Sequence, residues 1–280
     1  MYYLFVIGKF LALIFPRSIC YFFAKLLANL HFYLSATDRK TVYYNFSALV
    51  SDKKKLQKCA KEVFVNFSYY LVDFFRYQKL NLEFISKYVR ISGLEYLEEA
   101  LFKKKGIILL SAHFGNYELG GAIFSLLGYP CYTIALSHKD RRLNNFFNKQ
   151  RSKVRLKVFP VGYNPKKYLE LLKEGKILAL LGDRDFSNSS IKVKMFSRYA
   201  LLPRGPAFFA LKTGSTIIPS FLIREKKFFY NLIFEKPIFC DTNQYKSEEE
   251  VISAYILVLE KYLKKYPQQW YLFEKYWLNL

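Results

Sequence analysis

The sequence has few of the residues from which metal sites and disulfide frameworks are built. Its four cysteines lie far apart, and none of them belongs to a C-x-x-C pair. This spacing argues against a zinc site or a disulfide network, and it is typical of small buried hydrophobic residues in a reducing compartment. Histidine is scarce as well, with three residues in 280. We therefore expect no metal and no bound cofactor.

Acidic residues are also in short supply. Only 22 Asp and Glu stand against 44 Lys and Arg, which gives a formal net charge of +22. Such a field attracts anionic partners, and the candidates are an anionic membrane surface, nucleic acid, a phosphorylated glycolipid and an acidic carrier protein. The densest basic run extends from Lys139 to Lys157, where Asp140 is the one acid. A run of this kind is equally typical of a solvated surface.

No uninterrupted apolar run reaches the roughly 20 residues that a membrane-spanning helix needs. Residues 1–36 are nonetheless aromatic and aliphatic throughout, with Lys9, Arg17 and Lys25 as their only Lys or Arg and no acid. We expect them to form a membrane-anchoring hairpin or interfacial segment whose basic side chains extend toward lipid headgroups. A single tilted span and a buried helix pair are the alternatives. Residues 37–280 are expected to form one α/β domain.

The rest of the chain alternates strand-like apolar runs with helical patterns. Strands are expected at 107–110, 129–135, 154–161, 177–181, 217–224 and 228–234. Helices are expected at 51–80, 93–100, 117–127, 165–174 and 205–213, and from Ser247 to the residues before Pro267. This alternation predicts the α/β class, with a mostly parallel sheet flanked by helices on both faces.

The segment 107–121, IILLSAHFGNYELGG, holds the most informative pattern. Its first four residues predict a buried strand, and a helix capped by Asn116 follows. His113 and Glu118 therefore lie at the carboxyl end of a strand, where open α/β sheets bind ligands. Glu118 is expected to reach back to the ring of His113, fix its tautomer and stabilise the imidazolium. A plain loop histidine, and a carboxylate that only favours the helix N-terminus, are the alternatives.

A second polar group follows the strand predicted at 177–181. Arg184 lies between Asp183 and Asp185 at the end of this strand, on the same sheet edge as His113. We expect Arg184 to bind a phosphate or to stabilise an oxyanion, with the two acids holding it in place. The alternative is a turn that contains a simple ion pair.

These blocks resemble the lysophospholipid acyltransferase superfamily. The stretch from His113 to Glu118 matches its H-x4-D/E box, and HFGNYEL resembles the lipid A biosynthesis acyltransferases in particular. The other matching blocks are RxxVxxN at 39–45, LGDRD at 181–185, LPRGPA at 202–207, KTGSTIIP at 212–219 and YPQQW at 266–270. The Asp-Arg-Asp of the second block is closer to the phosphatidylinositol mannoside acyltransferases, because lipid A enzymes often carry Asp-Gln there.

The resemblance implies a glycerolipid acyltransferase-like fold with membrane-associated N-terminal helices. It further implies transfer of a fatty acyl chain from a thioester, of acyl-carrier protein or of coenzyme A, to a hydroxyl of a lipid A precursor. The reaction would take place at the cytoplasmic face of the inner membrane. Another glycolipid, of the phosphatidylinositol mannoside type, or a lysophospholipid is the alternative acceptor.

The resemblance also suggests roles for individual residues. His113 would act as general base, since its unperturbed pKa lies near neutrality, and Glu118 would orient it. The residues expected to bind substrate are Asn116, Arg151, Asp183, Arg184, Asp185 and Arg204. A rival interpretation is a noncatalytic basic module that binds anionic membrane or nucleic acid. Because no recognisable nucleic-acid motif is present, we do not expect nucleic acid as a partner.

Overall fold

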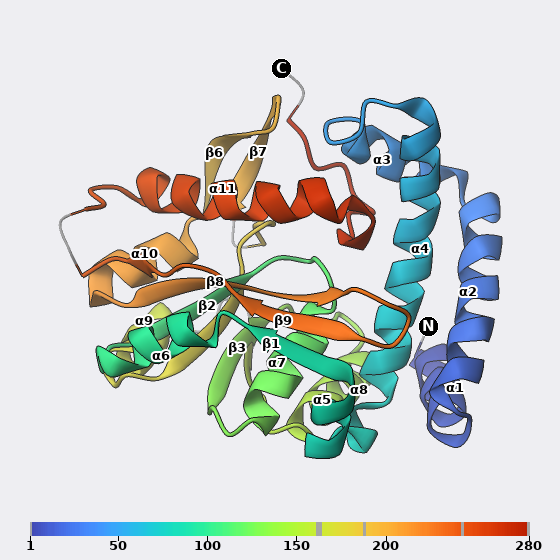
Figure 1. Cartoon of the computed structure of the whole chain (residues 1–280), viewed down its shortest axis with the longest axis horizontal. Coiled ribbons are helices and arrows are strands. Elements are labelled where there is room, and N and C mark those ends of the chain that lie inside the picture. The colour runs from blue at the N-terminus through green and yellow to red at the C-terminus, as the bar shows by residue number, and fades with distance from the viewer. Residues whose placement is uncertain (1, 161–163, 187–188, 242–243, 279–280) are drawn as a thin grey trace.

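The structure is a computed structural model that describes residues 2–160, 164–186, 189–241 and 244–278. A sheet with the strand order β1-β9-β8-β2-β5-β3-β4 runs through its centre, and β10 pairs with β8 (Figure 1). The bounds are β1 (Val89–Ser92), β2 (Ile107–Ser111), β3 (Cys131–Ala135), β4 (Lys157–Pro160), β5 (Ile177–Leu181), β8 (Thr216–Arg224), β9 (Tyr230–Phe234) and β10 (Ile238–Phe239).

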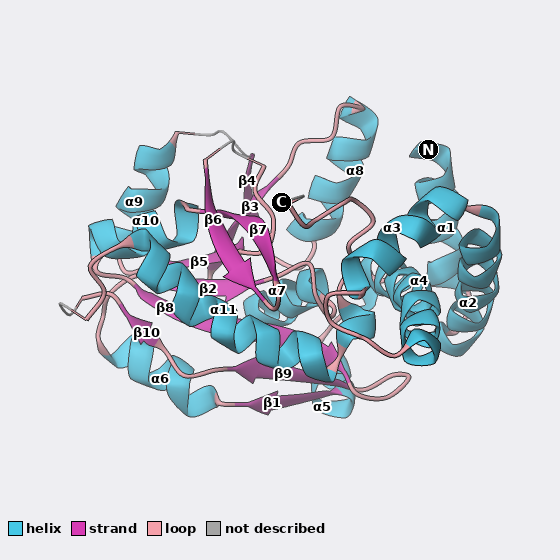
Figure 2. Ribbon diagram, turned by 90° about the horizontal axis from the view of Figure 1, so that it is seen from above, coloured by secondary structure: helices cyan, strands magenta, loops and turns pink. Residues whose placement is uncertain are grey.

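The sheet is mainly parallel, as the sequence predicts. Pairs β2–β5, β2–β8, β3–β5, β3–β4 and β1–β9 are parallel, whereas β8–β9 and β8–β10 are antiparallel. All six predicted strands are confirmed within three residues at each end in the part of the chain that is described; residue 161, the last of the predicted strand 154–161, lies outside it. The short strand β1 was not predicted. The separate hairpin of β6 (Ser190–Met195) and β7 (Arg198–Pro203), which lies beside α11 (Figure 2), was also missed.

Helices cover both faces of the sheet, so that two apolar layers form. One layer contains α9 (Pro165–Lys173), α10 (Gly205–Thr213) and α11 (Glu248–Lys265), and the other contains α6 (Leu94–Phe102), α7 (Tyr117–Leu126) and α8 (Arg141–Ser152). Successive residues of β2 alternate between them, because side chains along a strand point to opposite faces. Ile108 and Leu110 belong to the first layer, and Ile107 and Leu109 to the second.

The N-terminal helices stand together at one end of the sheet (Figure 1). They are α1 (Tyr2–Ile14), α2 (Arg17–Leu34), α3 (Ala36–Phe46) and α4 (Lys53–Phe75), and the short elements η1 (Tyr77–Lys79) and α5 (Leu82–Tyr88) follow. Helix α2 packs along α4, which contributes side chains to both apolar layers. No single helix in the described ranges is long and apolar enough to cross a bilayer; α2 and α3 reach that length together but bend by 90° where they meet.

The prediction that basic residues of the first 36 extend toward headgroups is wrong for Arg17. Its side chain is 11% exposed and forms an ion pair with Asp73 of α4 at 3.0 Å. Pro16 turns the chain between α1 and α2, and this turn directs the first side chain of α2 inward. Lys25 is exposed, and its extension toward headgroups stays a prediction.

Asn45 attaches the C-terminal tail to the rest of the fold. Its buried amide donates to the carbonyl oxygens of Leu272 and Glu274, and its Oδ1 accepts the N–H of Tyr276 at 3.1 Å. Its backbone oxygen accepts the indole N–H of Trp277 at 2.8 Å. The asparagine of the RxxVxxN block therefore determines where the chain after η2 (Pro267–Gln269) runs.

We expect Asn45→Ala to lower the free energy of unfolding by about 2 to 3 kcal/mol, because it leaves buried groups of the tail without partners. Urea denaturation measures this loss. Asn145→Ala, at an exposed position of α8, is the matched control and should change stability by less than about 0.5 kcal/mol. Equal effects of the two substitutions would contradict the assignment.

Candidate active site

His113 lies in the loop between β2 and α7, and its partner is Asp183 at the end of β5. Nδ1 of the ring is 2.8 Å from Asp183 Oδ1, which also accepts the backbone N–H of His113 at 3.0 Å. The pair forms because β2 and β5 are parallel neighbours with Ser111 opposite Leu181. Their carboxyl ends therefore bring both loops to one edge of the sheet.

Asp183 is fully buried, and its second oxygen accepts the indole N–H of Trp270 at 3.0 Å. Burial alone would raise the pKa of this carboxyl group. The charge and hydrogen bonds of His113, with the nearby charge of Arg184 and the Trp270 bond, outweigh burial and lower the pKa to about 2. The carboxylate is thus ionised near neutral pH. It accepts a proton-bearing Nδ1, which leaves Nε2 of His113 as the proton acceptor.

The predicted contact between Glu118 and His113 is wrong. Glu118 forms an ion pair with Arg151 of α8, in which Arg151 Nε lies 3.1 Å from Glu118 Oε2 and both side chains are 10% exposed. The reason is helical phase, since adjacent residues of a helix point about 100° apart. Tyr117 packs edge-on against the His113 ring at 5.3 Å, and Glu118 faces α8.

Asn116 also differs from its prediction as a substrate ligand. It caps α7, as expected, because its Oδ1 accepts the N–H of Leu119. Its Nδ2 donates to Asp73 at 2.9 Å, and the side chain is buried. Both ends of the amide are therefore used inside the protein, and the residue does not line the pocket described below.

The three remaining candidates occupy different positions. Arg184 is beside His113, with its Nε 3.3 Å from Nδ1. Because Nδ1 carries the proton donated to Asp183, we regard this as a close contact and not as a second hydrogen bond. Asp185 accepts the N–H of Ser189 at 2.9 Å. Arg204 forms two hydrogen bonds, of 2.7 and 2.8 Å, with Glu248 on a more exposed surface.

The loop that carries His113 is held by backbone contacts on both sides. Gly115 has a φ of 64°, and its N–H donates to the carbonyl oxygen of Gln269 at 2.8 Å. A Cβ at this position would lie 2.2 Å from the carbonyl oxygen of Leu222, so both the conformation and the space require glycine. The carbonyl oxygen of His113 accepts the N–H of Tyr271 at 2.9 Å. Strand β8 and the C-terminal tail therefore clamp the loop.

A pocket of about 880 Å³ opens beside the His113 ring. The candidate residues that line it are His113, Glu118, Arg151, Arg184, Asp185 and Arg204, whereas Asp183 does not line it. Its wall is mostly apolar and includes Phe67, Leu109, Phe124, Leu156, Phe208 and Leu222. Two glycines of α7, at 120 and 121, also line it, and a Cβ added at position 120 would lie 3.2 Å from Cβ of Leu222 on β8. The space is suited to an apolar chain.

Comparison with known sequences identifies the family. The sequence profile of a family described as bacterial lipid A biosynthesis acyltransferase matches residues 1–279. The chain belongs to this family.

Individual relatives match over shorter segments. A phosphatidylinositol mannoside acyltransferase of Mycobacterium tuberculosis is 27% identical over 134 residues, which cover 46% of this chain and 42% of the relative. One from Mycolicibacterium smegmatis is 24% identical over 159 residues, with 55% and 52% covered. The lipid A biosynthesis palmitoleoyltransferase of Escherichia coli is 20% identical over 190 residues, with 66% and 60% covered. The matched segments thus span about half the length of these relatives.

In this member of the family, several of the sequence blocks that carry the resemblance lie close to His113. LGDRD contributes Asp183, and YPQQW contributes Trp270, which donates to Asp183. Gln269 of the same block holds both the N–H and the carbonyl oxygen of Arg224 through its side chain, at 3.0 and 2.9 Å. The sequence interpretation did not predict the contact between Trp270 and Asp183, because nothing in YPQQW indicates which buried acid its indole reaches.

The lowered pKa of Asp183 predicts a specific pH dependence of stability. The folded-state pKa of about 2 lies below the ordinary value of 3.8. The ionised carboxylate therefore stabilises the fold fully above about pH 4, and this contribution is lost as the pH falls toward 2. We expect the difference in unfolding free energy between wild type and Asp183→Asn to shrink by roughly 2 kcal/mol over this window. Urea titrations from pH 6 to pH 2 measure it, and a constant difference would contradict the assignment.

Proposed function

We propose that this protein is a membrane-associated acyltransferase that moves a fatty acyl chain from a thioester to a hydroxyl of a glycolipid. The observation that carries the proposal is the His113–Asp183 pair at the edge of an apolar pocket of about 880 Å³. Membership of the lipid A biosynthesis acyltransferase family supports the same chemistry. The pocket suits the acyl chain, and the pair suits activation of a weak nucleophile.

In the proposed reaction, Nε2 of His113 takes the proton of the acceptor hydroxyl while the hydroxyl oxygen attacks the thioester carbonyl carbon. Asp183 stabilises the imidazolium that forms, because the carboxylate remains ionised and hydrogen-bonded to Nδ1. Collapse of the tetrahedral intermediate breaks the C–S bond. The imidazolium then gives its proton to the leaving thiolate, which restores neutral His113 and releases the thiol.

Arg184 is the cation best placed to stabilise the developing oxyanion. It lies beside the His113 ring and lines the pocket, and its guanidinium lies over Phe186 at 5.6 Å. A fixed positive charge near the reacting carbonyl lowers the energy of the tetrahedral intermediate. We assign Glu118 to holding Arg151 in the pocket wall, where Arg151 contacts substrate. Arg204 and Asp185 also line the pocket.

The net charge and the relatives support the choice of a donor and an acceptor. We propose acyl-carrier protein as donor, because the net charge of +22 favours an acidic partner; coenzyme A is the alternative. The proposed acceptor is a lipid A precursor. A glycolipid of the phosphatidylinositol mannoside type is a second candidate, because relatives with that printed activity match this chain. The His113–Asp183 pair does not support the alternative of a noncatalytic basic module.

The α1–α2 hairpin suits attachment to the cytoplasmic face of the inner membrane. It exposes large apolar side chains that include Phe10, Phe22, Phe23, Leu27, Leu30 and Leu34. Phe5 of α1 lines the pocket and packs against Phe146 and Phe147 of α8 at 6.0 and 5.5 Å. The hairpin therefore lies between the proposed bilayer and the pocket, and lipid substrates would approach along it.

The catalytic assignment predicts that His113→Ala and Asp183→Asn each lower kcat by about 10²- to 10⁴-fold. Glu118→Gln should act mainly on substrate binding and stability, because its carboxylate does not contact His113. Transfer of a radiolabelled acyl chain from acyl-carrier protein and coenzyme A thioesters to a lipid A precursor and to a phosphatidylinositol mannoside measures each variant. Undiminished transfer by His113→Ala would refute the mechanism.

The membrane assignment predicts weaker binding to anionic vesicles when the exposed face of α2 is made polar. Leu27→Gln combined with Leu30→Gln should lower the partition coefficient by about tenfold or more, since burial of each leucine side chain in the bilayer contributes roughly 2 kcal/mol to the binding free energy. Vesicle co-sedimentation measures this. Leu257→Gln, on the exposed face of α11 and 72% exposed, is the matched control. Equal losses at both sites would argue against the hairpin as the docking surface.

A further inference from the structure

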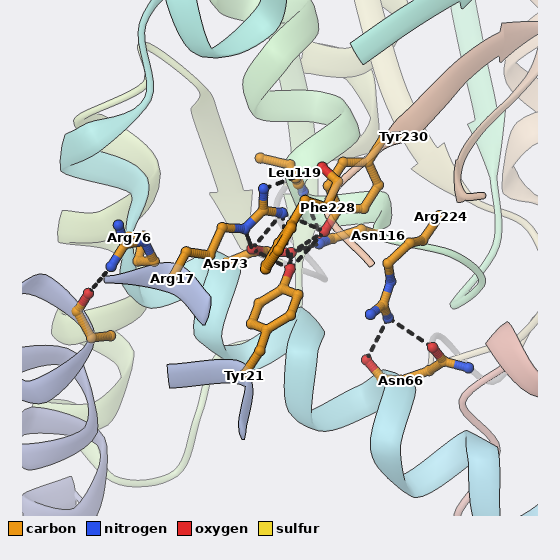
Figure 3. A network of polar contacts seen from close by, with 11 residues as sticks. Arg17, Tyr21, Asn66, Asp73, Arg76, Asn116, Leu119, Arg224, Phe228 and Tyr230 are labelled. Carbon is orange, nitrogen blue, oxygen red and sulfur yellow. Dashed lines mark hydrogen bonds and ion pairs between the residues drawn. The ribbon is translucent and has the colours of Figure 1, made fainter. Parts of the chain in front are cut away.

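Asp73 of α4 forms the centre of a buried polar network that does not line the pocket (Figure 3). Its side chain is 4% exposed and accepts from Arg17 Nε at 3.1 Å, from the Tyr21 hydroxyl at 2.8 Å and from Asn116 Nδ2 at 2.9 Å. The hydroxyl of Tyr230 on β9 donates to it as well. A buried carboxylate with this many donors fixes the relative positions of the segments that supply them.

One side of the network holds the bend between α1 and α2. Besides Asp73, Arg17 donates to the carbonyl oxygen of Phe228 at 3.2 Å and to the hydroxyls of Tyr21 and Tyr230, each at 2.9 Å. Arg17 is the first residue of α2. The bend of the hairpin is therefore attached to α4 and to the connection between β8 and β9.

The other side of the network holds the loop that carries His113. Asn116 is three residues beyond His113, and its amide has one allowed orientation, with Nδ2 toward Asp73 and Oδ1 toward the N–H of Leu119. The backbone N–H of Asn116 donates to the carbonyl oxygen of Leu222 at 2.8 Å. Asp73 thus determines how Asn116 enters α7, and through it the path of the preceding residues.

The second buried arginine of this region does not replace Arg17. Figure 3 shows the guanidinium of Arg224 directed toward Asn66, and its Nη2 donates to Asn66 Oδ1 at 2.8 Å. Arg224 also lies over the ring of Tyr69 at 4.6 Å. Among the described residues, Arg17 is the cation in ion-pair contact with Asp73.

We propose that Asp73 is a positioning residue that couples the bend of the α1–α2 hairpin to the His113 loop. The placement of the hairpin then influences the geometry of His113, although neither Arg17 nor Asp73 lines the pocket. The catalytic consequence rests on the proposed function, because it is measured by acyl transfer. The structural consequence is a change in the His113 loop when the bend is released, and this consequence does not rest on the proposed function.

The test is a double-substitution cycle between Arg17 and Asn116, which form no hydrogen bond with each other. Arg17→Met removes the ion pair, and Asn116→Ser keeps a helix cap but deletes the amide that reaches Asp73. We expect Arg17→Met to lower kcat by about tenfold with little change in KM, as a misplaced catalytic group does. In the Asn116→Ser background, the same substitution should have less than about a twofold further effect.

Hydrogen exchange of the full-length protein provides a readout independent of catalysis. The N–H groups of Gly115 and Asn116 are bonded to Gln269 and Leu222, and in Arg17→Met they should exchange at least about tenfold faster than in wild type. Arg76→Met is the matched control: the Arg76 side chain donates to the carbonyl oxygens of Ala12 and Phe15 at the end of α1 but not to Asp73. It should loosen α1 and leave the loop unchanged.

Each outcome decides the proposal. The proposal would be overturned by unchanged loop exchange in Arg17→Met or by multiplicative effects on kcat in the double variant. An equal increase in loop exchange in Arg76→Met would also overturn it. If Arg17→Met does not fold, Arg17→Lys replaces it, because lysine keeps the charge but lacks the fork of donors. Faster loop exchange in Arg17→Lys than in wild type supports the coupling, and unchanged loop exchange overturns it. If wild type transfers no acyl chain, the proposed function fails, and the exchange measurements still decide the coupling.

Discussion

The carboxylate of Asp183 joins three segments that are distant in the sequence. It binds the backbone and ring of His113 after β2, follows β5 itself, and accepts the indole N–H of Trp270 in the C-terminal tail. A charge buried this completely is stable only when its partners are in place. These partners are brought together by the strand order of the sheet, by the contacts that hold the His113 loop and by the path of the tail after α11. The apolar pocket beside the ring is located by the same contacts.

Much of the fold follows from sequence patterns, because buried parallel strands and capped helices have strong local signals. The site was predicted less completely. The sequence placed His113 and Asp183 at one sheet edge, but it paired His113 with Glu118, since proximity in sequence does not reveal the direction in which a helical residue points. Helix α8 was missed because Gln150 and Arg151 occupy part of its buried face, so its apolar stripe is incomplete.

Arg17 shows a related limit of reasoning from composition. In an aromatic, aliphatic segment without acids, its expected partner was lipid; the actual partner, Asp73, lies 56 residues further along the chain. Buried ion pairs of this kind are seldom a net source of stability, but they reject alternative arrangements that would leave a charge unpaired. Glu118–Arg151 and Asp73–Arg17 both have this character. Residues of both pairs lie near the start of α7, the helix that follows the loop carrying His113.

The pocket is lined by residues of both apolar layers of the protein. Leu109, Phe124, Leu156 and Leu222 line it and also belong to the core cluster on the α7 face of the sheet. An acyl chain in this space would pack as an interior side chain does, so each of its methylene groups would contribute to the cohesion of the protein itself. Under the proposed function the substrate would complete the hydrophobic core, and release of the acylated product would leave that core incomplete until another chain entered.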